Sequence, residues 1–239
     1  MPYDFYHGEC LLINKPYTWS SFQAVNKIKH ALKQHPSWIQ DGEKRKVKIG
    51  HAGTLDPLAT GLLIVCTGKM TKRISEFMGL EKEYTGTFTL GATTPCYDLE
   101  KPVDQHFPTD HISEDMILKT ASGCMGRQMQ VPPLFSAVQV EGKRAYELAR
   151  EGKHTELKAR EIEITQFEIT EIKLPQVNFR IRCSKGTYIR SIARDFGQAL
   201  QSGAHLSALC RTRIGEFSIE DAMDPQTFSE MIRKDQMLR

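Results

Sequence analysis

The sequence predicts an α+β protein built on a mixed, largely antiparallel central sheet that is flanked by helices. Short segments with strand character follow one another across short turns, as in residues 161–172 and 177–183. Segments with helical periodicity occur between them at irregular places. The strict strand–helix alternation of a doubly wound parallel sheet is absent. At 239 residues, of which 40% are hydrophobic, the chain can bury a substantial core.

The first part of the chain predicts a strand, a helix and a loop. Residues 9–15 (ECLLINK) are a short apolar run before a proline and predict a buried strand. Ser20 or Ser21 can cap the helix that follows, because apolar residues recur after them at helical spacing. Residues 35–46 contain a proline and a glycine, so we expect a loop that leads to a short strand over 47–49.

Two strands with different patterns are expected next. Residues 62–66 are continuously apolar, which predicts a buried strand, and a short helix is expected over 71–78. Residues 83–90 alternate in the period of two that is typical of a strand with two unlike faces. Tyr84 is therefore expected on the same face of its strand as Phe88.

The remainder of the chain continues this irregular succession of elements. We expect an exposed polar loop over 98–111 and a helix over 114–122. Further strands are expected over 128–131, 135–140, 161–172 and 177–183, and further helices over 145–150 and 189–200.

The distribution of charge is more informative than its sum. The net charge is only +3, which gives little general attraction to nucleic acid. Any one basic cluster is most simply a solvated face, but several around one site favour a polyanionic partner, because each neutralised phosphate releases counterions. The clusters are Lys44, Arg45, Lys46 and Lys48; Lys69, Lys72 and Arg73; Arg180, Arg182, Lys185, Arg190 and Arg194; and Arg211 and Arg213.

The chain lacks the sequence signals of secreted, membrane and zinc-binding proteins. Its 6 cysteines are scattered, with no C-x-x-C pair and no Cys/His spacing suited to zinc. The first residues have no basic start followed by an apolar core. The longest apolar run, 62–66, is far shorter than the roughly 20 residues of a membrane span. We therefore expect a cytoplasmic protein with reduced thiols.

A glycine-rich segment, GHAGTLDPLATG over residues 50–61, contains the strongest candidate for a catalytic group. Its glycines permit tight turns and close approach of a ligand, and Pro57 stiffens the loop directly after Asp56. An arbitrary Asp-Pro pair is more often a turn that bonds its own backbone, but His51 in the same bend weakens that alternative. The segment also lacks the Gly-Lys-Ser/Thr ending of a phosphate loop. Asp56 is predicted to be a catalytic carboxylate.

A second segment, CSKGTYIRSIARDFG over residues 183–197, passes from a strand into a helix. Tyr188 and Arg190 fall at the start of that helix and can project over the end of the sheet. Arginine suits a fixed, bidentate pairing with a carboxylate, so we predict an Asp56–Arg190 pair. The alternative is an ordinary amphipathic helix with a surface arginine.

Two further segments are ambiguous when taken alone. VPPLFSAVQVEGKRAYELAREG, over residues 131–152, is typical of a hairpin and a helix with basic residues available for phosphate contacts. GAHLSALCRTRIGEF, over residues 203–217, carries Leu209 shortly before Arg211 and Arg213. Its simplest interpretation is a core leucine beside a solvated basic stripe.

These four segments, in this order, together with ECLLINKP and EKEYTGTFTLG, resemble the TruB family of tRNA pseudouridine-55 synthases. The resemblance extends from residue 9 to about residue 224, and the Asp56 loop is highly specific. It implies the pseudouridine synthase fold and the conversion of one uridine in the TΨC arm of tRNA to pseudouridine. The N-glycosidic bond is broken and the base is rejoined through carbon, without a metal or a cofactor.

The resemblance also implies roles for individual residues. Asp56 matches the nucleophile, which attacks either the ribose C1′ or the uracil ring. The target base must be flipped out of a folded loop, and His51 matches the residue linked to that step and to substrate binding. Tyr84 matches the tyrosine that stacks on the flipped base and is a candidate general base. Further matches are the substrate-contacting Tyr188 and Leu209, and Arg190 as the basic partner of the nucleophile.

The sequence departs from the family pattern in three regions, one of which is the stretch 17–20 (YTWS), where the common Gly-x-Thr-Ser form is lacking. Phe135 and Gln139 stand where the family usually has Tyr and Lys in PPxYSAxK, which removes a hydroxyl group and a charge. Family members usually continue into a C-terminal PUA domain that grips the acceptor arm. This sequence has only about 15 residues after the part that resembles the family. We therefore expect a catalytic domain over 1–224 and a short tail over 225–239, without a full PUA domain. We expect a monomer that binds the TΨC arm of tRNA. We do not expect it to bind a membrane.

Two other functions are compatible with the same features. A non-catalytic RNA-binding or tRNA-folding module would keep the basic clusters but would not need Asp56. A base-removing glycosylase could also use a carboxylate near C1′, and it would release the base instead of rejoining it.

Overall fold

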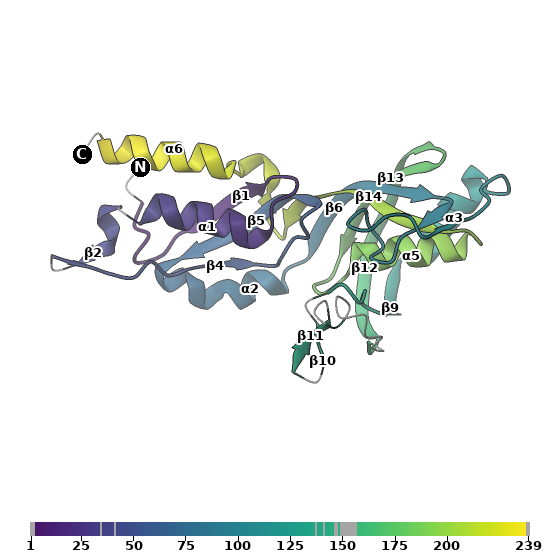
Figure 1. The fold of residues 1–239 in the computed structure, drawn as a ribbon, viewed down its shortest axis with the longest axis horizontal. Coiled ribbons are helices and arrows are strands. Elements are labelled where there is room, and N and C mark those ends of the chain that lie inside the picture. Colours follow the sequence, from purple (N-terminus) through teal and green to yellow (C-terminus); the bar gives the residue numbers. More distant parts are fainter. Residues whose placement is uncertain are drawn as a thin grey trace. The chain divides into compact units, whose positions relative to one another are not determined.

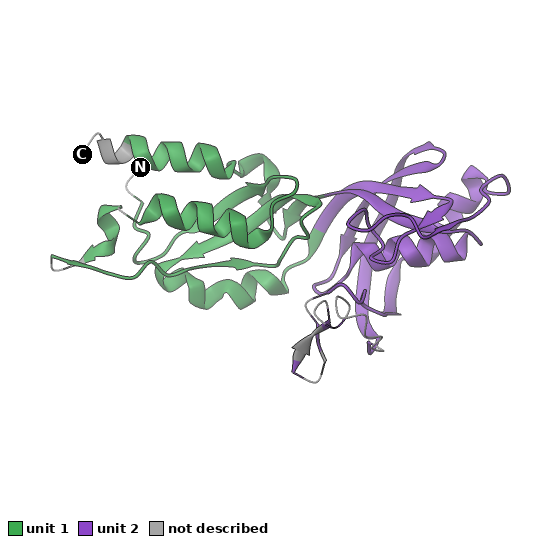
Figure 2. Cartoon of the chain, viewed as in Figure 1, with its two compact units in different colours: residues 1–82, 210–239 green, residues 83–209 purple. Residues whose placement is uncertain are grey.

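The chain forms two compact units in its computed structural model, and both ends of the chain contribute to the first (Figure 2). Unit 1 comprises residues 1–82 and 210–239, and unit 2 comprises residues 83–209. The strand pairs with described registers are antiparallel, which confirms the predicted fold class. The structure describes residues 3–33, 35–40, 42–136, 138–140, 142–145, 148 and 157–237.

The elements of unit 1 therefore come from segments far apart in the sequence (Figure 1). Residues 210–214 of strand β14 (Ala204–Ile214) also belong to it, and β14 pairs with β5. In chain order the other elements are β1 (Cys10–Lys15), α1 (Ser21–Leu32), the 3-10 helix η1 (Pro36–Trp38), β2 (Ile39–Gln40), β3 (Glu43–Lys44), β4 (Ile49–Ala52), β5 (Ala59–Thr67), η2 (Gly68–Arg73), α2 (Ile74–Gly79), β15 (Phe217–Ser218), η3 (Ile219–Asp221) and α6 (Pro225–Met237).

Strand β5 is central to unit 1 because both of its faces are buried. Leu63 and Val65 lie in the core that α1 and α6 cover. Leu62 and Ile64 lie in a second core, which contains Phe77 of α2. Strand β1 pairs with β5 along its whole length. Burial on both faces explains why this segment is continuously apolar, and the predicted strand is confirmed.

Helix α1 begins where its sequence predicts. The side chain of Ser20 accepts a hydrogen bond from the backbone of Gln23, whose side chain bonds back to the backbone of Ser20. The apolar face of α1 then packs on the sheet together with Phe228 and Ile232 of α6. The buried residues of α1 are Ser21, Ala24, Val25, Ile28 and Leu32.

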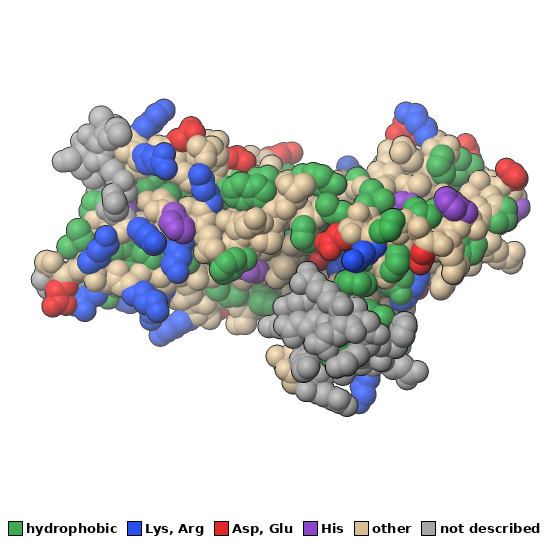
Figure 3. All heavy atoms as spheres, in the orientation of Figure 1, with side chains coloured by type: hydrophobic (Ala, Val, Ile, Leu, Met, Phe, Trp, Pro, Cys, Tyr) green, Lys and Arg blue, Asp and Glu red, His purple; other side chains and the backbone are tan. Residues whose placement is uncertain are grey.

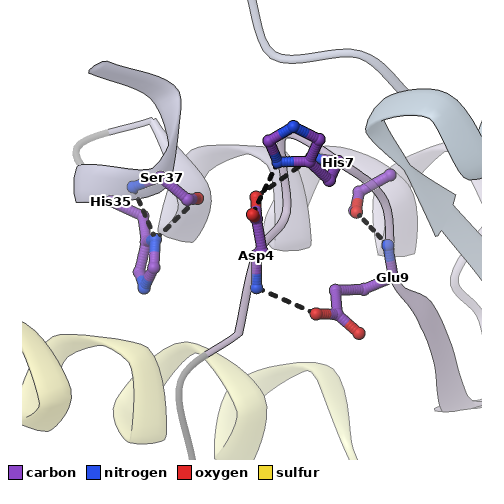
Figure 4. A network of polar contacts seen from close by, with 6 residues as sticks. Asp4, His7, Glu9, His35 and Ser37 are labelled. Carbon is purple, nitrogen blue, oxygen red and sulfur yellow. Dashed lines mark hydrogen bonds and ion pairs between the residues drawn. The ribbon is translucent and has the colours of Figure 1, made fainter. Parts of the chain in front are cut away.

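A polar network fastens the N-terminal segment to the end of β5 (Figure 4). The amide of Asp4 donates to the carboxylate of Glu9 at 2.9 Å, and Nδ1 of His7 lies 2.6 Å from the carboxylate of Asp4. The amide of Glu9 donates to the hydroxyl of Thr67 at 2.9 Å. In the same view His35 caps η1 with its ring. These bonds fix the point at which β5 passes into η2.

Unit 2 is a second part of the sheet, in the strand order β14-β6-β13-β12-β9, with helices packed on it. Residues 204–209 of β14 belong to unit 2, and residues 210–214 of the same strand belong to unit 1. The other elements are β6 (Lys82–Leu90), of which residues 83–90 lie in this unit, β7 (Ala92–Thr93), β8 (Gln105–His106), α3 (Glu114–Gly123), β9 (Gly126–Gln130), β10 (Gln139–Val140), β11 (Lys143–Arg144), β12 (Arg160–Lys173), β13 (Gln176–Cys183) and α5 (Ile189–Ala199).

An aromatic cluster forms the centre of unit 2. The rings of Phe88 and Phe179, on neighbouring strands, are 4.2 Å apart between centroids. Phe196 brings α5 onto this sheet, with its ring 5.4 Å from Phe88 and 5.7 Å from Phe167. Tyr84 is 9% exposed and Phe88 is fully buried, as expected for alternate positions on one face of β6.

Two predicted loops contain more structure than expected. Residues 35–46 form η1 and the β2–β3 hairpin, because Trp38, 1% exposed, anchors the segment in the core of unit 1. Residues 98–111 include β8, which pairs with β7, and Asp98 at their start is only 4% exposed. The rest of the segment is largely exposed, so the prediction of an exposed loop was wrong only at Asp98 and in missing the short strand β8.

Other predictions differ in extent. The strand expected over 135–140 is limited to β10, and most of the helix expected over 145–150 lies outside the described residues. No strand was expected over 204–214, where β14 runs. Within the described part of the chain, no helix has the length and apolar character that a membrane crossing requires.

Candidate active site

The Asp56 loop connects β4 to β5 in unit 1 and is held at its centre by α1. The carbonyl of Asp56 accepts a hydrogen bond from the amide of Ala59 at 3.1 Å, which closes a turn around Pro57. Leu55 is 3% exposed. The hydroxyl of Ser21 donates to the carbonyl of Leu55 at 3.1 Å and accepts from its amide at 2.8 Å. The backbone directly before the half-buried Asp56 is therefore fixed through both the amide and the carbonyl of one residue, Leu55.

A buried lysine holds the other side of the turn. Lys15 is fully buried, and its ammonium donates to the carbonyls of Pro16 at 2.9 Å, Trp19 at 2.5 Å and Pro57 at 3.3 Å. Burial lowers the pKa of Lys15 to about 8, although the nearby carboxylate of Asp56 acts in the opposite direction. Lys15 thus ties the start of α1 to the residue after Asp56 and adds a positive charge near the carboxylate.

A buried arginine holds the two flanks of the loop. Nε of Arg211 donates to the carbonyl of Leu62 at 2.8 Å, and one terminal nitrogen donates to the carbonyl of Gly53 at 2.9 Å. Gly61 has φ +106°, and a Cβ there would lie 2.3 Å from the carbonyl oxygen of Arg211, so only glycine fits. Arg211 is 2% exposed, so the interpretation of this residue as part of a solvated stripe was wrong.

His51 lies on β4 beside the same loop and is half-buried. Its Nδ1 is buried and has no hydrogen-bond partner among the described residues. Burial lowers the pKa of His51, and the charge of Arg211 lowers it further. The imidazole is therefore neutral near pH 7 and can exchange a hydrogen bond with a bound ligand.

In unit 2, the start of α5 is held by a glutamine of β9. Tyr188 occupies the N-cap position of α5 without a side-chain cap of its own. The side-chain oxygen of Gln130 accepts from the amide of Tyr188 at 2.8 Å, and its nitrogen donates to the carbonyl of Tyr188 at 3.2 Å. Gln130 is 2% exposed, so this clamp is shielded from water. Sequence reasoning did not identify Gln130.

Arg190 follows in the first turn of α5 and is buried, which excludes the alternative of a surface arginine. Its terminal nitrogens donate to the carbonyls of Cys96 at 3.2 Å and Phe135 at 2.9 Å. Its Nε lies 3.5 Å from the carboxylate of Asp98, and both side chains are 6% exposed. Asp98 is a second residue that sequence reasoning missed, because its partner lies far along the chain.

The structure brings the predicted residues together in two groups. Asp56 and His51 share the loop region of unit 1. Tyr84 of β6 and Leu209 of β14 belong to unit 2 with Tyr188 and Arg190; Tyr84 is buried and Leu209 half-buried. The predicted Asp56–Arg190 pair would join the two units and stays a prediction. Of the departures from the family pattern, Phe135 supplies a backbone carbonyl to Arg190, and Gln139 lies on β10.

Comparisons with known proteins show which proteins the chain is similar to. Residues 42–189 match the family described as TruB family pseudouridylate synthase (N terminal domain). The tRNA pseudouridine synthase B of Flavobacterium johnsoniae is 54% identical over 232 residues, which cover 97% of this chain and 99% of that protein. The protein of the same name from Bacteroides fragilis is 50% identical over 229 residues, with 96% of each chain covered.

Solved structures show the same fold. A Cbf5-Nop10-Gar1 complex contains a chain that matches 98% of this one with a TM-score of 0.71 and 26% identity, over 57% of its own length. The archaeal box H/ACA sRNP Nop10-Cbf5 complex gives a TM-score of 0.69 at 24% identity, over 56% of the matched chain. With the family match and relatives at about half identity over nearly the whole chain, the chain belongs to the TruB family of pseudouridylate synthases, which are isomerases that act on RNA.

Proposed function

We propose that this protein isomerises uridine 55 in the TΨC loop of tRNA to pseudouridine, acting in the cytoplasm as a monomer with Asp56 as the nucleophile. The observation that carries the proposal is the fixation of the Asp56 loop by three side chains from other elements. Ser21, Lys15 and Arg211 all bond to backbone carbonyls of this loop, which fixes the position of the residue that carries the carboxylate. The name of the relatives, tRNA pseudouridine synthase B, supports the substrate.

The chemistry proceeds by detaching and rejoining one base. The uridine is flipped out of its loop, with neutral His51 offering a hydrogen bond that replaces one lost in the RNA. The carboxylate of Asp56 adds to C1′ or to the ring, and the bond from N1 to C1′ breaks. C5 of the same base then bonds to C1′, Asp56 is released, the proton on C5 is removed and N1 takes up a proton, so that the product is an isomer of the substrate. Tyr84 is the candidate base for that last step.

The other residues keep the base and the nucleophile in position. Tyr188 and Leu209 wall the site against water, so that the detached uracil is retained. Arg190, fixed by its bonds to the carbonyls of Cys96 and Phe135 and by its ion pair with Asp98, is the predicted basic partner of Asp56. No step requires a group that the chain does not supply.

The decisive variant is Asp56→Asn, which keeps the size of the side chain and removes its nucleophilic charge. We expect the rate of pseudouridine formation on an unmodified tRNA transcript to fall about 10⁴-fold or more, with tRNA affinity nearly unchanged. Nucleoside analysis by chromatography and mass spectrometry measures the product, and a filter-binding titration measures the affinity. The control is Asp110→Asn, an exposed aspartate of unit 2, which should keep full activity.

Each alternative function gives a distinct result in the same assay. Free uracil released by the wild-type protein would identify a glycosylase. Tight binding of tRNA without any change in its nucleosides would identify a non-catalytic module. Substantial pseudouridine made by the Asp56→Asn variant would refute the assignment of the nucleophile. A tRNA substituted with 5-fluorouridine additionally tests for a stable adduct with the wild-type protein.

A further inference from the structure

Two cysteines face each other across the strands β1 and β5 of unit 1. Cys10 lies directly opposite Cys66 in the antiparallel register. In the adjacent pair, the amide of Thr67 donates a hydrogen bond to the carbonyl of Glu9 at 3.0 Å. Hydrogen-bonded and non-hydrogen-bonded pairs alternate along an antiparallel ladder, so Cys10 and Cys66 form a non-hydrogen-bonded pair. In such a pair the Cα atoms are about 4.5 Å apart and the side chains are at their closest.

The two side chains lie on one face of the sheet and are in contact. Cys66 is fully buried in the core that contains Phe77, and Cys10 packs against the same core. Both thiols are free, and a hydrogen bond joins them. A disulfide requires Cα atoms about 4.4–6.8 Å apart and side chains that point toward each other. The pair Cys10 and Cys66, here named the strand dithiol, meets both conditions.

The two thiols of the strand dithiol differ in reactivity. The hydrogen bond from Cys66 lowers the pKa of Cys10, and the charge of Arg73 lowers it further, against the effect of burial. The same hydrogen bond raises the pKa of Cys66, and burial raises it further. The helix η2 adds the exposed Lys69 and Lys72 directly after β5, and Figure 3 shows Lys and Arg side chains gathered on unit 1 with few acidic side chains between them. Cys10, which is half-buried, is therefore the thiolate that a reagent meets first.

We propose that the strand dithiol is a site of oxidation by hydroperoxides and closes into a disulfide that joins β1 to β5. The thiolate of Cys10 attacks the O–O bond, an S–O bond forms, and the alkoxide leaves as an alcohol after it takes up a proton. The thiol of Cys66 then loses its proton and attacks the sulfur of the Cys10 sulfenic acid, so that the S–S bond forms and water leaves. The two sulfurs supply the two electrons that reduce the hydroperoxide. A small thiol reverses the step by exchange.

The disulfide would add a cross-link without moving the Asp56 loop. It forms in the register that β1 and β5 already have, so neither strand has to shift. The loop enters β5 at Ala59, and a strand rises about 3.3 Å per residue, so Cys66 lies about 23 Å farther along. The bond restrains the unfolded chain over the long loop 10–66, which stabilises unit 1. The inference goes beyond the proposed function, because it assigns a second reactive site on the same scaffold.

The test treats the whole chain with a small molar excess of hydrogen peroxide. Free thiols are then alkylated, and the protein is digested without reduction and analysed by mass spectrometry. We expect a cross-linked pair of peptides that contains Cys10 and Cys66, and a rise in Tm of about 5–10 °C that dithiothreitol reverses. The control is Cys124→Ser, which removes another half-buried cysteine and should show the same cross-link and the same rise in Tm.

Variants of the strand dithiol test each half of the reaction. Cys10→Ser should lose both the cross-link and the rise in Tm. Cys66→Ala should leave Cys10 as a sulfenic acid, which dimedone traps as an adduct. The two variants change opposite strands, so a folding defect in one leaves the other informative. A wild-type protein in which peroxide oxidises Cys10 to a sulfinic acid while Cys66 stays free would overturn the proposal.

Activity and stability separate a lock on the scaffold from a change in the active site. The rate at which the oxidised protein modifies RNA should stay within about twofold of that of the reduced protein, because the disulfide is far from the Asp56 loop. A loss of activity that dithiothreitol restores would contradict the separation of the strand dithiol from that loop. An unchanged Tm in the cross-linked protein would refute the stabilising role of the bond.

Discussion

At the scale of single residues, two buried cations explain why the Asp56 loop has one conformation. A buried charge is tolerated only when hydrogen bonds replace its lost hydration. Lys15 and Arg211 obtain those bonds from backbone carbonyls of the loop and its flanks. The same bonds that satisfy the cations therefore fix the backbone on which the carboxylate of Asp56 is carried.

Arg211→Met should destabilise the protein by about 2–4 kcal/mol, because it leaves the carbonyls of Gly53 and Leu62 buried without that donor. Methionine fills most of the volume, so the loss is of hydrogen bonds more than of packing. Urea unfolding measures the change. The control, Arg213→Met, removes a side chain whose bond to the carbonyl of Glu216 is exposed, and should stay within about 0.5 kcal/mol of wild type. Equal effects of the two variants would contradict the assigned role of Arg211.

The sequence identified Asp56 and His51 but not the residues that hold their loop. Asp56 is recognisable because glycine and proline mark the special backbone around it. Lys15 and Arg211 bond to carbonyl groups, which every residue has, so no pattern of side chains reveals the pairing. A cation in a sequence is most often solvated, and that general expectation made the interpretation of Arg211 wrong.

At the scale of elements, the start of α5 depends on a neighbouring strand. The helix has no side-chain cap at Tyr188, and Gln130 of β9 binds the backbone of that residue from both sides. In most helices a residue of the same segment supplies this capping. The position of Tyr188 and of Arg190 two residues later is therefore set by β9 as well as by α5.

Gln130→Ala should destabilise the protein by about 1–3 kcal/mol and should increase amide exchange at the start of α5. The reason is that the amide and the carbonyl of Tyr188 both lose a buried partner. Hydrogen exchange followed by mass spectrometry locates the effect, and urea unfolding gives its size. Gln176→Ala, at an exposed position of β13, is the matched control and should change neither quantity. Unchanged exchange at the start of α5 in Gln130→Ala would refute the clamp.

Elements were predictable where burial imposes a regular pattern of apolar residues along the segment. The strands β1, β5 and β6 and the helices α1 and α5 lie within the segments predicted for them or overlap them closely. Strand β14 was not predicted, because it places the polar Arg211 inside the protein and so breaks the alternation typical of a strand. The β2–β3 hairpin was missed because the segment is short and the burial of Trp38, which anchors it, is not visible in the local sequence pattern.

At the scale of the whole molecule, unit 1 depends on contacts between the two ends of the chain. Phe228 and Ile232 of α6 share one core with Phe5 and with the buried face of α1. The segment predicted as a short tail, 225–239, thus includes a helix that covers the sheet carrying the Asp56 loop. Sequence patterns describe neighbours along the chain, and they gave no sign that residues 83–209 would form a unit between two halves of another.

Phe228→Ala should destabilise unit 1 by about 3–5 kcal/mol, since a fully packed aromatic side chain leaves a cavity between α6 and α1. Hydrogen exchange should show lost protection in β1 and β5 as well as in α6, because all three contribute to one core. The control is Phe22→Ala on α1, where the ring is 69% exposed and the expected cost is below about 1 kcal/mol. Loss of protection confined to α6 would contradict the shared core.

The split of unit 1 also sets the order in which the protein can form on the ribosome. Residues 83–209 emerge between the strands β1 and β5 and the helix α6 that covers them. At a translation rate of about 5–20 residues per second, the apolar face of β5 waits on the order of ten seconds for its cover. During this interval the core of unit 1 lacks Phe228 and Ile232. The scaffold of the Asp56 loop is therefore complete only after α6 has been synthesised.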